Sequence, residues 1–302
     1  MIDIFIPSYH RAKNLKTVKY FLDLGWKSDK LHVFIDTEDD QVDLYRAESD
    51  KHGFHLHIFD IDKARSSYDF LHRPNPNRRT AGLTRNAMYD ISHQLKIKQF
   101  VIIDDDTQNY QLQPFGIYRR KAEFLEVIKV FECVKVFMDK QRLGIFGLSQ
   151  TGDMFAKSDT KILRNKVMNT TFVHTDYVDC PEKGILDSDT ASFVEIMNAG
   201  LFTGSLRSGL VLSQSPSATQ KGGLTDSYKQ RGLLSKALET PIMRPSLAVA
   251  QHQPRNGGRI HHRIKYKNLF PKLMKGERGN IAWDTYPEDI KFTNKRQRNA
   301  TN

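Results

Sequence analysis

Apolar and polar residues alternate at the start of the chain, where Ile2, Ile4 and Ile6 precede a break at Pro7. This period-two spacing predicts a β-strand that enters a loop. Similar strand patterns then alternate with stretches whose apolar residues recur at helical spacing and that end at a glycine. The expected strands are residues 2–6, 31–36, 55–61 and 99–106, and the expected helices are residues 15–25, 37–53 and 83–95. Such alternation predicts an α/β fold with a mixed, mainly parallel sheet flanked by helices.

The pattern becomes less regular beyond residue 110. We expect an amphipathic helix around Phe124–Val134, strands at 142–149 and 167–175, and a helix at 190–199. From about residue 213 the chain is richer in Ser, Gly, Gln and Pro, which predicts a mobile loop region, and its last dozen residues predict a frayed basic tail. We therefore expect a core over residues 1–212 and a basic C-terminal elaboration over 213–302, within one continuous domain.

Composition narrows the class of protein. Of the 302 residues, 39% are hydrophobic and 27% are charged, as in ordinary globular proteins. No apolar stretch approaches the roughly 20 residues needed to cross a bilayer, and the N-terminal segment lacks a signal-peptide pattern. Cys133 and Cys180 lie far apart and fit neither a disulfide framework nor a zinc site. We expect a cytoplasmic protein without a membrane partner.

The formal net charge is +11. Charge of this size favours polyanionic partners such as nucleic acid, although many basic proteins bind none. Composition alone leaves these two possibilities open.

Three consecutive acids, Asp104, Asp105 and Asp106, follow the apolar run Phe100–Ile103. Carboxylates at the carboxyl end of a parallel strand face the ligand crevice, and residues i and i+2 of a strand point to one side. Two such carboxylates hold Mg²⁺ or Mn²⁺, whose open positions take phosphate oxygens and neutralise a departing diphosphate. The competing interpretation is a solvated strand end or a helix N-cap, and three acids alone do not decide between them.

Two further segments accompany these acids: IFIPSYHRAKNL at residues 4–15 and AGLTRNAMYDI at residues 81–91. Together the three resemble the nucleotide-sugar-binding half of the GT-A glycosyltransferases over roughly the first 110 residues. The resemblance implies a fold of GT-A type, a nucleotide-sugar donor and a divalent cation, with Asp104 and Asp106 as metal ligands. It also implies donor-binding roles for Pro7, Ser8, Arg11, Asp36, Gly82, Arg85, Asn86, Asp104 and Asp105.

The segment ILDSDTASFVEIMNAG, at residues 185–200, places acids just before a short helix. It resembles the acidic motif at which GT-A enzymes place the residue that faces the acceptor. The resemblance implies a catalytic base at Asp189, with Asp187 as the second choice. A base must lie within hydrogen-bond reach of the acceptor hydroxyl. The alternative is that Asp189 only caps the helix.

Basic residues gather late in the chain. From Arg255 to Arg278 there are eight Lys and Arg residues and a single acid, with Tyr266 and Phe270 among them. Such a stretch suits phosphate contacts and base stacking, and a solvated basic face is the alternative. The expected DNA-binding residues are Arg255, Arg259, Arg263, Lys265 and Lys267, together with Arg78 and Arg79 from a smaller set that includes His72 and Arg73. The GT-A resemblance also implies a late histidine as a metal ligand, either His262 or His261, with His252 behind them.

The segment GGRIHHRIKYKNLFPK (residues 257–272) and the overall size resemble the phage TET-associated glycosyltransferases. That resemblance implies transfer of a sugar, from a UDP-sugar, to a 5-hydroxymethylpyrimidine in DNA, with hydroxymethylcytosine as the expected base. The location would then be the host cytoplasm. Such a base must be reached in the major groove or flipped out of the stack, and both require a basic surface along the DNA.

Other functions remain open at this point. A GT-A transferase acting on a saccharide or another acceptor uses the same donor site. A metal-dependent nuclease combines carboxylates with basic charge, and a DNA-binding protein without activity would use only the charge. The sequence does not decide whether sugar transfer inverts or retains the anomeric centre.

Overall fold

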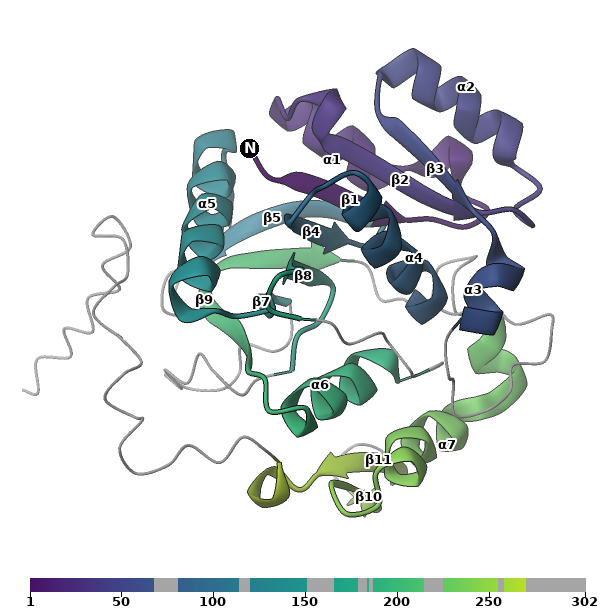
Figure 1. The fold of residues 1–302 in the computed structure, drawn as a ribbon, viewed down its shortest axis with the longest axis vertical. Coiled ribbons are helices and arrows are strands. Elements are labelled where there is room, and N and C mark those ends of the chain that lie inside the picture. The colour runs from purple at the N-terminus through teal and green to yellow at the C-terminus, as the bar shows by residue number, and fades with distance from the viewer. Residues whose placement is uncertain are drawn as a thin grey trace, which may run out of the picture.

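The computed structural model describes residues 1–67, 81–113, 120–150, 166–178, 184, 187–214, 225–254 and 258–269 (Figure 1). Several residues expected to bind DNA therefore lie outside the described part of the chain. These are Arg78, Arg79 and Arg255, along with His72, Arg73 and the C-terminal tail.

The described part of the chain is built on a nine-stranded sheet with the order β3-β2-β1-β4-β8-β7-β9-β5-β6. Only β8 and β5 run opposite to the other strands. The expected mixed, mainly parallel sheet is thus confirmed. The strands are β1 (Asp3–Pro7), β2 (Leu31–Asp36), β3 (His55–Phe59), β4 (Gln99–Ile103), β5 (Thr107–Gln113), β6 (Arg120–Lys121), β7 (Ile145–Gln150), β8 (Thr170–His174) and β9 (Thr203–Gln214).

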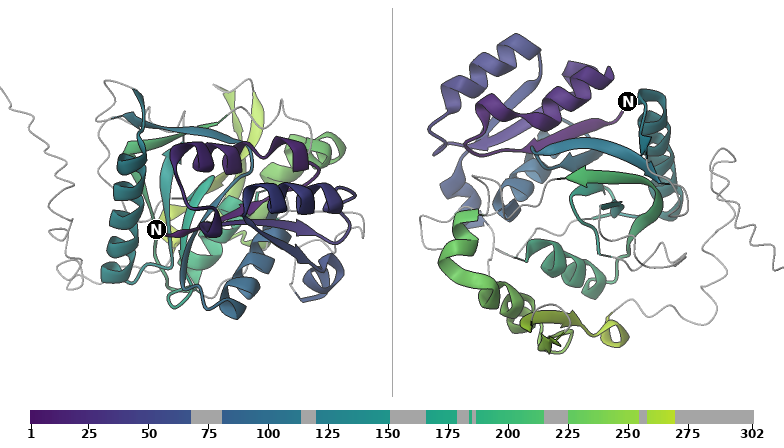
Figure 2. Two further views of the ribbon diagram at one scale, coloured as in Figure 1. Left: turned by 90° about the horizontal axis from the view of Figure 1, so that it is seen from above. Right: turned by 180° about the vertical axis from the view of Figure 1, so that it is seen from behind.

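Helices flank the sheet, as Figure 2 shows from two further sides. They are α1 (Lys16–Leu24), α2 (Val42–His52), α3 (Ile61–Ser67), α4 (Ala81–Gln94), α5 (Phe124–Gln141), α6 (Ser188–Asn198) and α7 (Thr225–Met243). No helix among the described residues is both long and apolar enough to span a bilayer.

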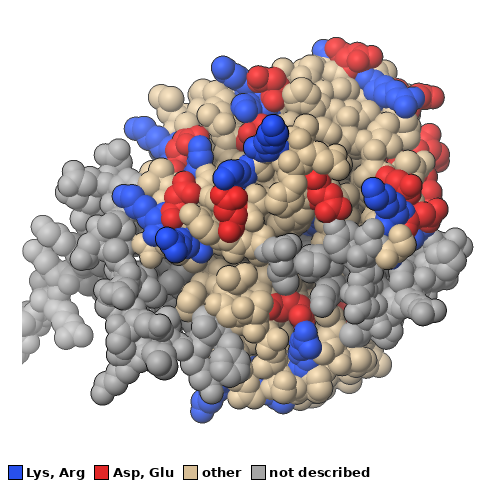
Figure 3. Space-filling model, viewed as in Figure 1, with Lys and Arg blue, Asp and Glu red and all other residues tan. Residues whose placement is uncertain are grey.

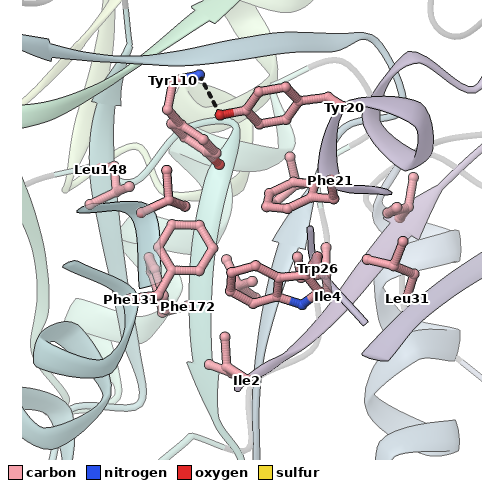
Figure 4. Close-up of a cluster of buried hydrophobic side chains, with 14 of the residues drawn as sticks. Ile2, Ile4, Tyr20, Phe21, Trp26, Leu31, Tyr110, Phe131, Leu148 and Phe172 are labelled. Carbon is pink, nitrogen blue, oxygen red and sulfur yellow. Dashed lines mark hydrogen bonds between the residues drawn. The ribbon is translucent and has the colours of Figure 1, made fainter. Parts of the chain in front are cut away.

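Alternation along the buried strands assigns side chains to the two faces of the sheet. Ile4 and Ile6 of β1 pack with α1 and α5, whereas Phe5 packs on the other face with Met88 of α4. Figure 4 shows the first of these clusters, in which Phe131 meets the rings of Trp26 and Phe172 at centroid distances of 5.7 and 5.0 Å. Burial on both faces fixes the register of the parallel strands.

The C-terminal part of the chain differs from the prediction. Strand β9 extends to Gln214, α7 begins at Thr225, and a two-stranded hairpin of β10 (Ala248–Gln253) and β11 (Arg259–Ile264) follows, and the sequence predicted none of these elements. The segment richest in Ser, Gly, Gln and Pro, for which a loop region was expected, covers residues 215–224 and lies outside the described residues. The hairpin lies beside α6 and α7 (Figure 1), where Ile264 and Leu269 pack against Phe193 and Met197.

Because β1, β2 and β4 are parallel neighbours, their carboxyl ends meet at one edge of the sheet. Ser8, Asp36 and the acids of residues 104–106 follow these ends directly. The motif residues of the N-terminal half therefore converge as the sequence predicts.

Candidate active site

The three consecutive acids form a turn and not the end of a strand. Strand β4 ends at Ile103 and β5 begins at Thr107, whose amide and hydroxyl both donate to the carbonyl of Asp104, at 3.4 and 3.2 Å. The expected strand over residues 99–106 therefore ends three residues early, and the expectation that Asp104 and Asp106 point to one side because they alternate along a strand is wrong. Asp105 and Asp106 both face Arg11, and Asp104 faces Arg85.

Residues of the loop after β1 hold Asp105. The hydroxyl of Ser8 donates to Oδ2 of Asp105 at 2.7 Å and accepts from the hydroxyl of Tyr45, at 2.8 Å. The guanidinium of Arg11 contacts Oδ1 of Asp105 and lies 3.5 Å from Oδ2 of Asp106. Ser8 and Arg11 thus lie in the site as predicted, while Tyr45 of α2 had no sequence signal.

The backbone of the turn is fixed by α1. The hydroxyl of Thr17, a fully buried residue, donates to the carbonyl of Asp104 and accepts from the amide of Thr107, at 3.0 Å. The amide of Thr17 donates to the carbonyl of Asp105, at 3.2 Å. The first turn of α1 therefore positions all three acids, a role that sequence analysis did not find.

Charge is concentrated at this turn. Burial raises the pKa of Asp105 to about 7 although Arg11 and Ser8 act in the opposite direction, and the neighbouring acids raise it further. Burial likewise raises the pKa of Asp104 against the influence of Arg85, with Asp106 adding to the rise. With 28% of its side chain exposed, Asp104 is the most open of the three acids. The charged forms of Asp104 and Asp105 are therefore disfavoured by burial and by the neighbouring acids.

The motif helix α4 brings Arg85 to the site. Its Nη2 lies 3.5 Å from Oδ1 of Asp104. Gly82 and Asn86 of the same helix are buried, so they support the helix from inside the fold. Asp36 is buried at the end of β2, where its Oδ1 accepts from the amide of Glu38 at 2.9 Å.

Asp189, in the first turn of α6, belongs to the same site. Its Oδ2 lies 2.6 Å from Nζ of Lys166. Burial pushes the pKa of Asp189 up, but the charges of Lys166, Lys236 and Arg85 outweigh this and hold the pKa below its usual range. Arg85 thus contacts Asp104, and its charge also contributes to the lowered pKa of Asp189, less than the charges of Lys166 and Lys236 do.

Asp187 takes a different position. It is fully buried, and its carboxylate accepts from the hydroxyls of Thr190 and Thr240, at 2.9 and 2.8 Å. Nδ1 of His262 lies 2.9 Å from Oδ2 of Asp187, close enough for an ion pair but without hydrogen-bond alignment. Asp187 thus joins α6, α7 and β11, and it has no exposed oxygen to offer an acceptor.

The predicted histidines lie on the hairpin. Nε2 of His262 is 3.2 Å from the hydroxyl of Thr190, so His262 faces α6. Burial, with the charges of His262 and Arg259, lowers the pKa of His261. Neither histidine joins a set of three potential metal ligands in the described part of the chain, where the set that does form is His10, Asp39 and Asp40. His252 is exposed on β10.

The basic residues of the hairpin face outward in part. Arg259, Arg263 and Lys267 are exposed, whereas Lys265 is partly buried and donates to the carbonyl of Pro245, at 2.9 Å. On the face drawn in Figure 3, basic and acidic side chains lie side by side over the upper part of the molecule.

Comparison with known proteins identifies the family. The model of the TET-Associated Glycosyltransferase family matches residues 2–222. No curated protein matches the chain. Among solved structures, the chain is similar to the mannosyltransferase PcManGT from Pyrobaculum calidifontis, in complex with GDP-Man and Mn²⁺, with 13% identity and a TM-score of 0.48, covering 80% of this chain and 64% of that one.

Glucosyl-3-phosphoglycerate synthase from Mycobacterium tuberculosis, in complex with Mn²⁺, UDP and glucosyl-3-phosphoglycerate, is similar with 9% identity and a TM-score of 0.45, covering 87% and 86% of the two chains. These likenesses are too distant to bear on activity. The family match spans well over half of the sequence, from β1 through β9. The chain therefore belongs to the TET-associated glycosyltransferase family.

Proposed function

We propose that this glycosyltransferase moves a sugar from a UDP-sugar to the hydroxyl of a 5-hydroxymethylpyrimidine in DNA, with hydroxymethylcytosine as the base. The observation that carries the proposal is the contact of Arg85 with the acidic turn at Asp104, 3.5 Å away, in a member of this family. The reaction belongs in the cytoplasm, the host's if the protein is viral, where nucleotide sugars and DNA meet.

The acidic turn fits a divalent cation. Asp104 and Asp106 offer hard carboxylate oxygens, the ligands that Mn²⁺ and Mg²⁺ prefer. Burial raises the pKa values of Asp104 and Asp105 although Arg85 and Arg11 oppose it, and a bound cation would favour the charged carboxylates. Asp104 and Asp106 would hold the metal, and bound there it would stabilise the negative charge of the departing diphosphate. His261 remains a candidate for a further ligand, whereas His262 faces Asp187 and Thr190 and is assigned a structural role.

Asp189 is the proposed base for an inverting transfer. It takes the proton of the acceptor hydroxyl while the hydroxyl oxygen forms a bond to the anomeric carbon. The bond from that carbon to the diphosphate oxygen breaks, and its electron pair leaves with the nucleoside diphosphate. Arg85, beside Asp104, is placed to stabilise that leaving group. A retaining transfer would not require the base.

The hairpin is the proposed DNA-binding element. The major groove admits a two-stranded β-ribbon, and exposed guanidinium groups contact phosphates. Arg259 and Arg263 lie four residues apart on β11, a spacing that puts their side chains on the same face of the strand, and both are exposed. Lys265 and Lys267 follow, and Arg255, Arg78 and Arg79, which lie outside the described residues, are further candidates from the sequence. Residues 213–302 would thus supply acceptor binding, and residues 1–212 the donor site.

Incubation of the protein with hydroxymethylcytosine-containing DNA, Mn²⁺ and a panel of nucleotide sugars tests the proposal. Digestion and mass spectrometry should show a hexose or pentose added to the modified nucleoside. Asp104→Ala and Asp106→Ala should abolish the product, and Asp29→Ala, a residue outside the site, should not. Metal-dependent hydrolysis of the donor without DNA product would favour a saccharide or another acceptor. Failure of both reactions with every donor would overturn the proposal.

A further inference from the structure

Lys166 lies directly against the proposed base. Its Nζ is 2.6 Å from Oδ2 of Asp189 and 3.3 Å from the hydroxyl of Thr190. The side chains of Lys166 and Asp189 are 24% and 25% exposed, so the ion pair is shielded but reachable from solvent. Lys166 precedes β8 and belongs to none of the motifs that the sequence singled out.

The stability of helix α6 does not explain why Lys166 lies beside its first turn. The first turn of a helix carries partial positive charge, which favours an acid such as Asp189 and disfavours a cation. Asp189 would therefore stabilise α6 without Lys166. The ammonium is stabilised here by the carboxylate and by the hydroxyl of Thr190, which points to a role for the ion pair in the site.

The two oxygens of Asp189 differ. Oδ2 is the oxygen that lies nearest the ammonium of Lys166, and the second oxygen, Oδ1, belongs to a side chain that is 25% exposed. The other charges that act on the carboxylate are those of Lys236 on α7 and Arg85 on α4, and Lys166 has the strongest influence of the three. One oxygen is thus held by Lys166, in a side chain that a ligand can still reach.

We propose that Lys166 is a positioning residue that holds Oδ2 of Asp189 and so presents Oδ1 to the acceptor hydroxyl. The inference rests on the proposed role of Asp189 as the base. In the transfer step, the hydroxyl proton passes to Oδ1 while the bond from the acceptor oxygen to the anomeric carbon forms. Lys166 gives up no proton in this step.

Two measurements test the inference on Lys166→Met and Lys166→Arg. The first follows the ¹³C resonance of the Asp189 carboxyl against pH, identified by its loss in Asp189→Asn, and needs no acceptor. The second is kcat against pH on hydroxymethylcytosine-containing DNA with saturating donor. Lys98→Met is the matched control, because Lys98 forms an exposed ion pair with Asp176, at 2.9 Å, at the opposite edge of the sheet.

In Lys166→Met, we expect the pKa of the Asp189 carboxyl and the apparent pKa of the acid limb of the kcat–pH profile to rise together by about one pH unit. Loss of a nearby opposite charge raises the pKa of a carboxylate in this way. Lys166→Arg should restore most of kcat, and donor KM should stay constant. An unchanged carboxyl titration in Lys166→Met overturns the inference whatever the transfer assay shows. If Lys166→Met does not fold, the same titration in Lys166→Gln decides. Full activity of Asp189→Asn would also overturn it, while sugar transfer to DNA would still stand.

Discussion

Arg85 lies 3.5 Å from Asp104 and also stabilises the charge of Asp189, so a single guanidinium serves both halves of the site. Asp104 comes from the turn after β4, and Asp189 comes from α6, far along the chain. We expect Arg85→Gln to lower kcat/KM about 10- to 100-fold, because a preorganised cation at the leaving group is lost. Steady-state kinetics measure this change in kcat/KM. Arg46→Gln is the control, because Arg46 forms an exposed ion pair with Asp43 on α2. Equal kinetics for the two variants would contradict the assignment.

Thr17 should prove important for stability. Thr17→Val keeps the shape of the buried side chain but removes the hydroxyl that binds the carbonyl of Asp104 and the amide of Thr107. We expect the free energy of unfolding to fall by about 1–3 kcal/mol, the usual cost of buried polar groups left without a partner. Urea denaturation measures it. Thr171→Val, a strand position on β8, should change little.

A histidine pair on β2 and β3 should make stability depend on pH. Burial, with the charges of His32 and His55, lowers the pKa of His57 from 6.5 to about 4. As pH falls below 6.5, the unfolded chain binds a proton that the folded chain does not take up until about pH 4. Stability is therefore full above pH 6.5 and falls between pH 6.5 and 4.

In the wild type, Nε2 of His57 lies 3.0 Å from Nδ1 of His32. His57→Gln keeps a hydrogen-bonding group in the side chain at residue 57, but this group cannot be protonated. Denaturant unfolding from pH 4 to 8 should show a shallower acid decline for this variant than for the wild type. His52→Gln, on α2, should leave the decline unchanged. Identical curves for the wild type and His57→Gln would refute the prediction.

The hairpin arginines should determine DNA affinity. The double variant Arg259→Gln, Arg263→Gln should weaken binding to all DNA sequences similarly and reduce the slope of log K against log salt by about 2. Fluorescence anisotropy at several salt concentrations measures both. The double variant Lys129→Gln, Lys140→Gln removes the same charge from exposed positions of α5 and should keep the wild-type slope. Equal slopes for the two double variants would place the DNA elsewhere.

His262 should serve structure more than metal binding. It faces Asp187 and Thr190, so His262→Gln should lower the melting temperature while leaving Mn²⁺ affinity close to that of the wild type. Isothermal titration with Mn²⁺ and UDP, beside a thermal melt, separates the two effects. A large loss of Mn²⁺ affinity in a stable His262→Gln protein would instead make it a metal ligand, as the sequence suggested.

Local patterns predicted the first half of the fold well. The alternation of Ile4 and Phe5 between the two faces of the sheet follows from strand geometry alone, and the parallel order then brings Ser8 and Asp104 to one edge. The turn at residues 104–106 was not predictable, because the residue at which a strand ends depends on the contacts of Thr17, which lies on another element.

The second half resisted prediction for a related reason. The hairpin packs on α6 through Ile264, and Thr240 of α7 binds Asp187 at the start of α6, contacts that the composition of these segments does not report. Tyr45 and Lys166 reach the site through tertiary contacts with Ser8 and Asp189, and nothing in their sequence neighbourhood reports such contacts. By contrast, the resemblance of residues 185–200 to an acidic motif singled out Asp189, which lies in the first turn of α6.

The burial of Asp187 limits how this enzyme's acceptor preference can be changed. Its carboxylate has partners on α6, α7 and β11 at once. A chimera that exchanged only the hairpin for one without a histidine at this position would remove the His262 partner of a buried acid, and loss of such a partner is costly in a protein interior. The smallest segment that can be exchanged between relatives without this penalty therefore runs from Asp187 to the end of β11, and it carries the proposed base with it.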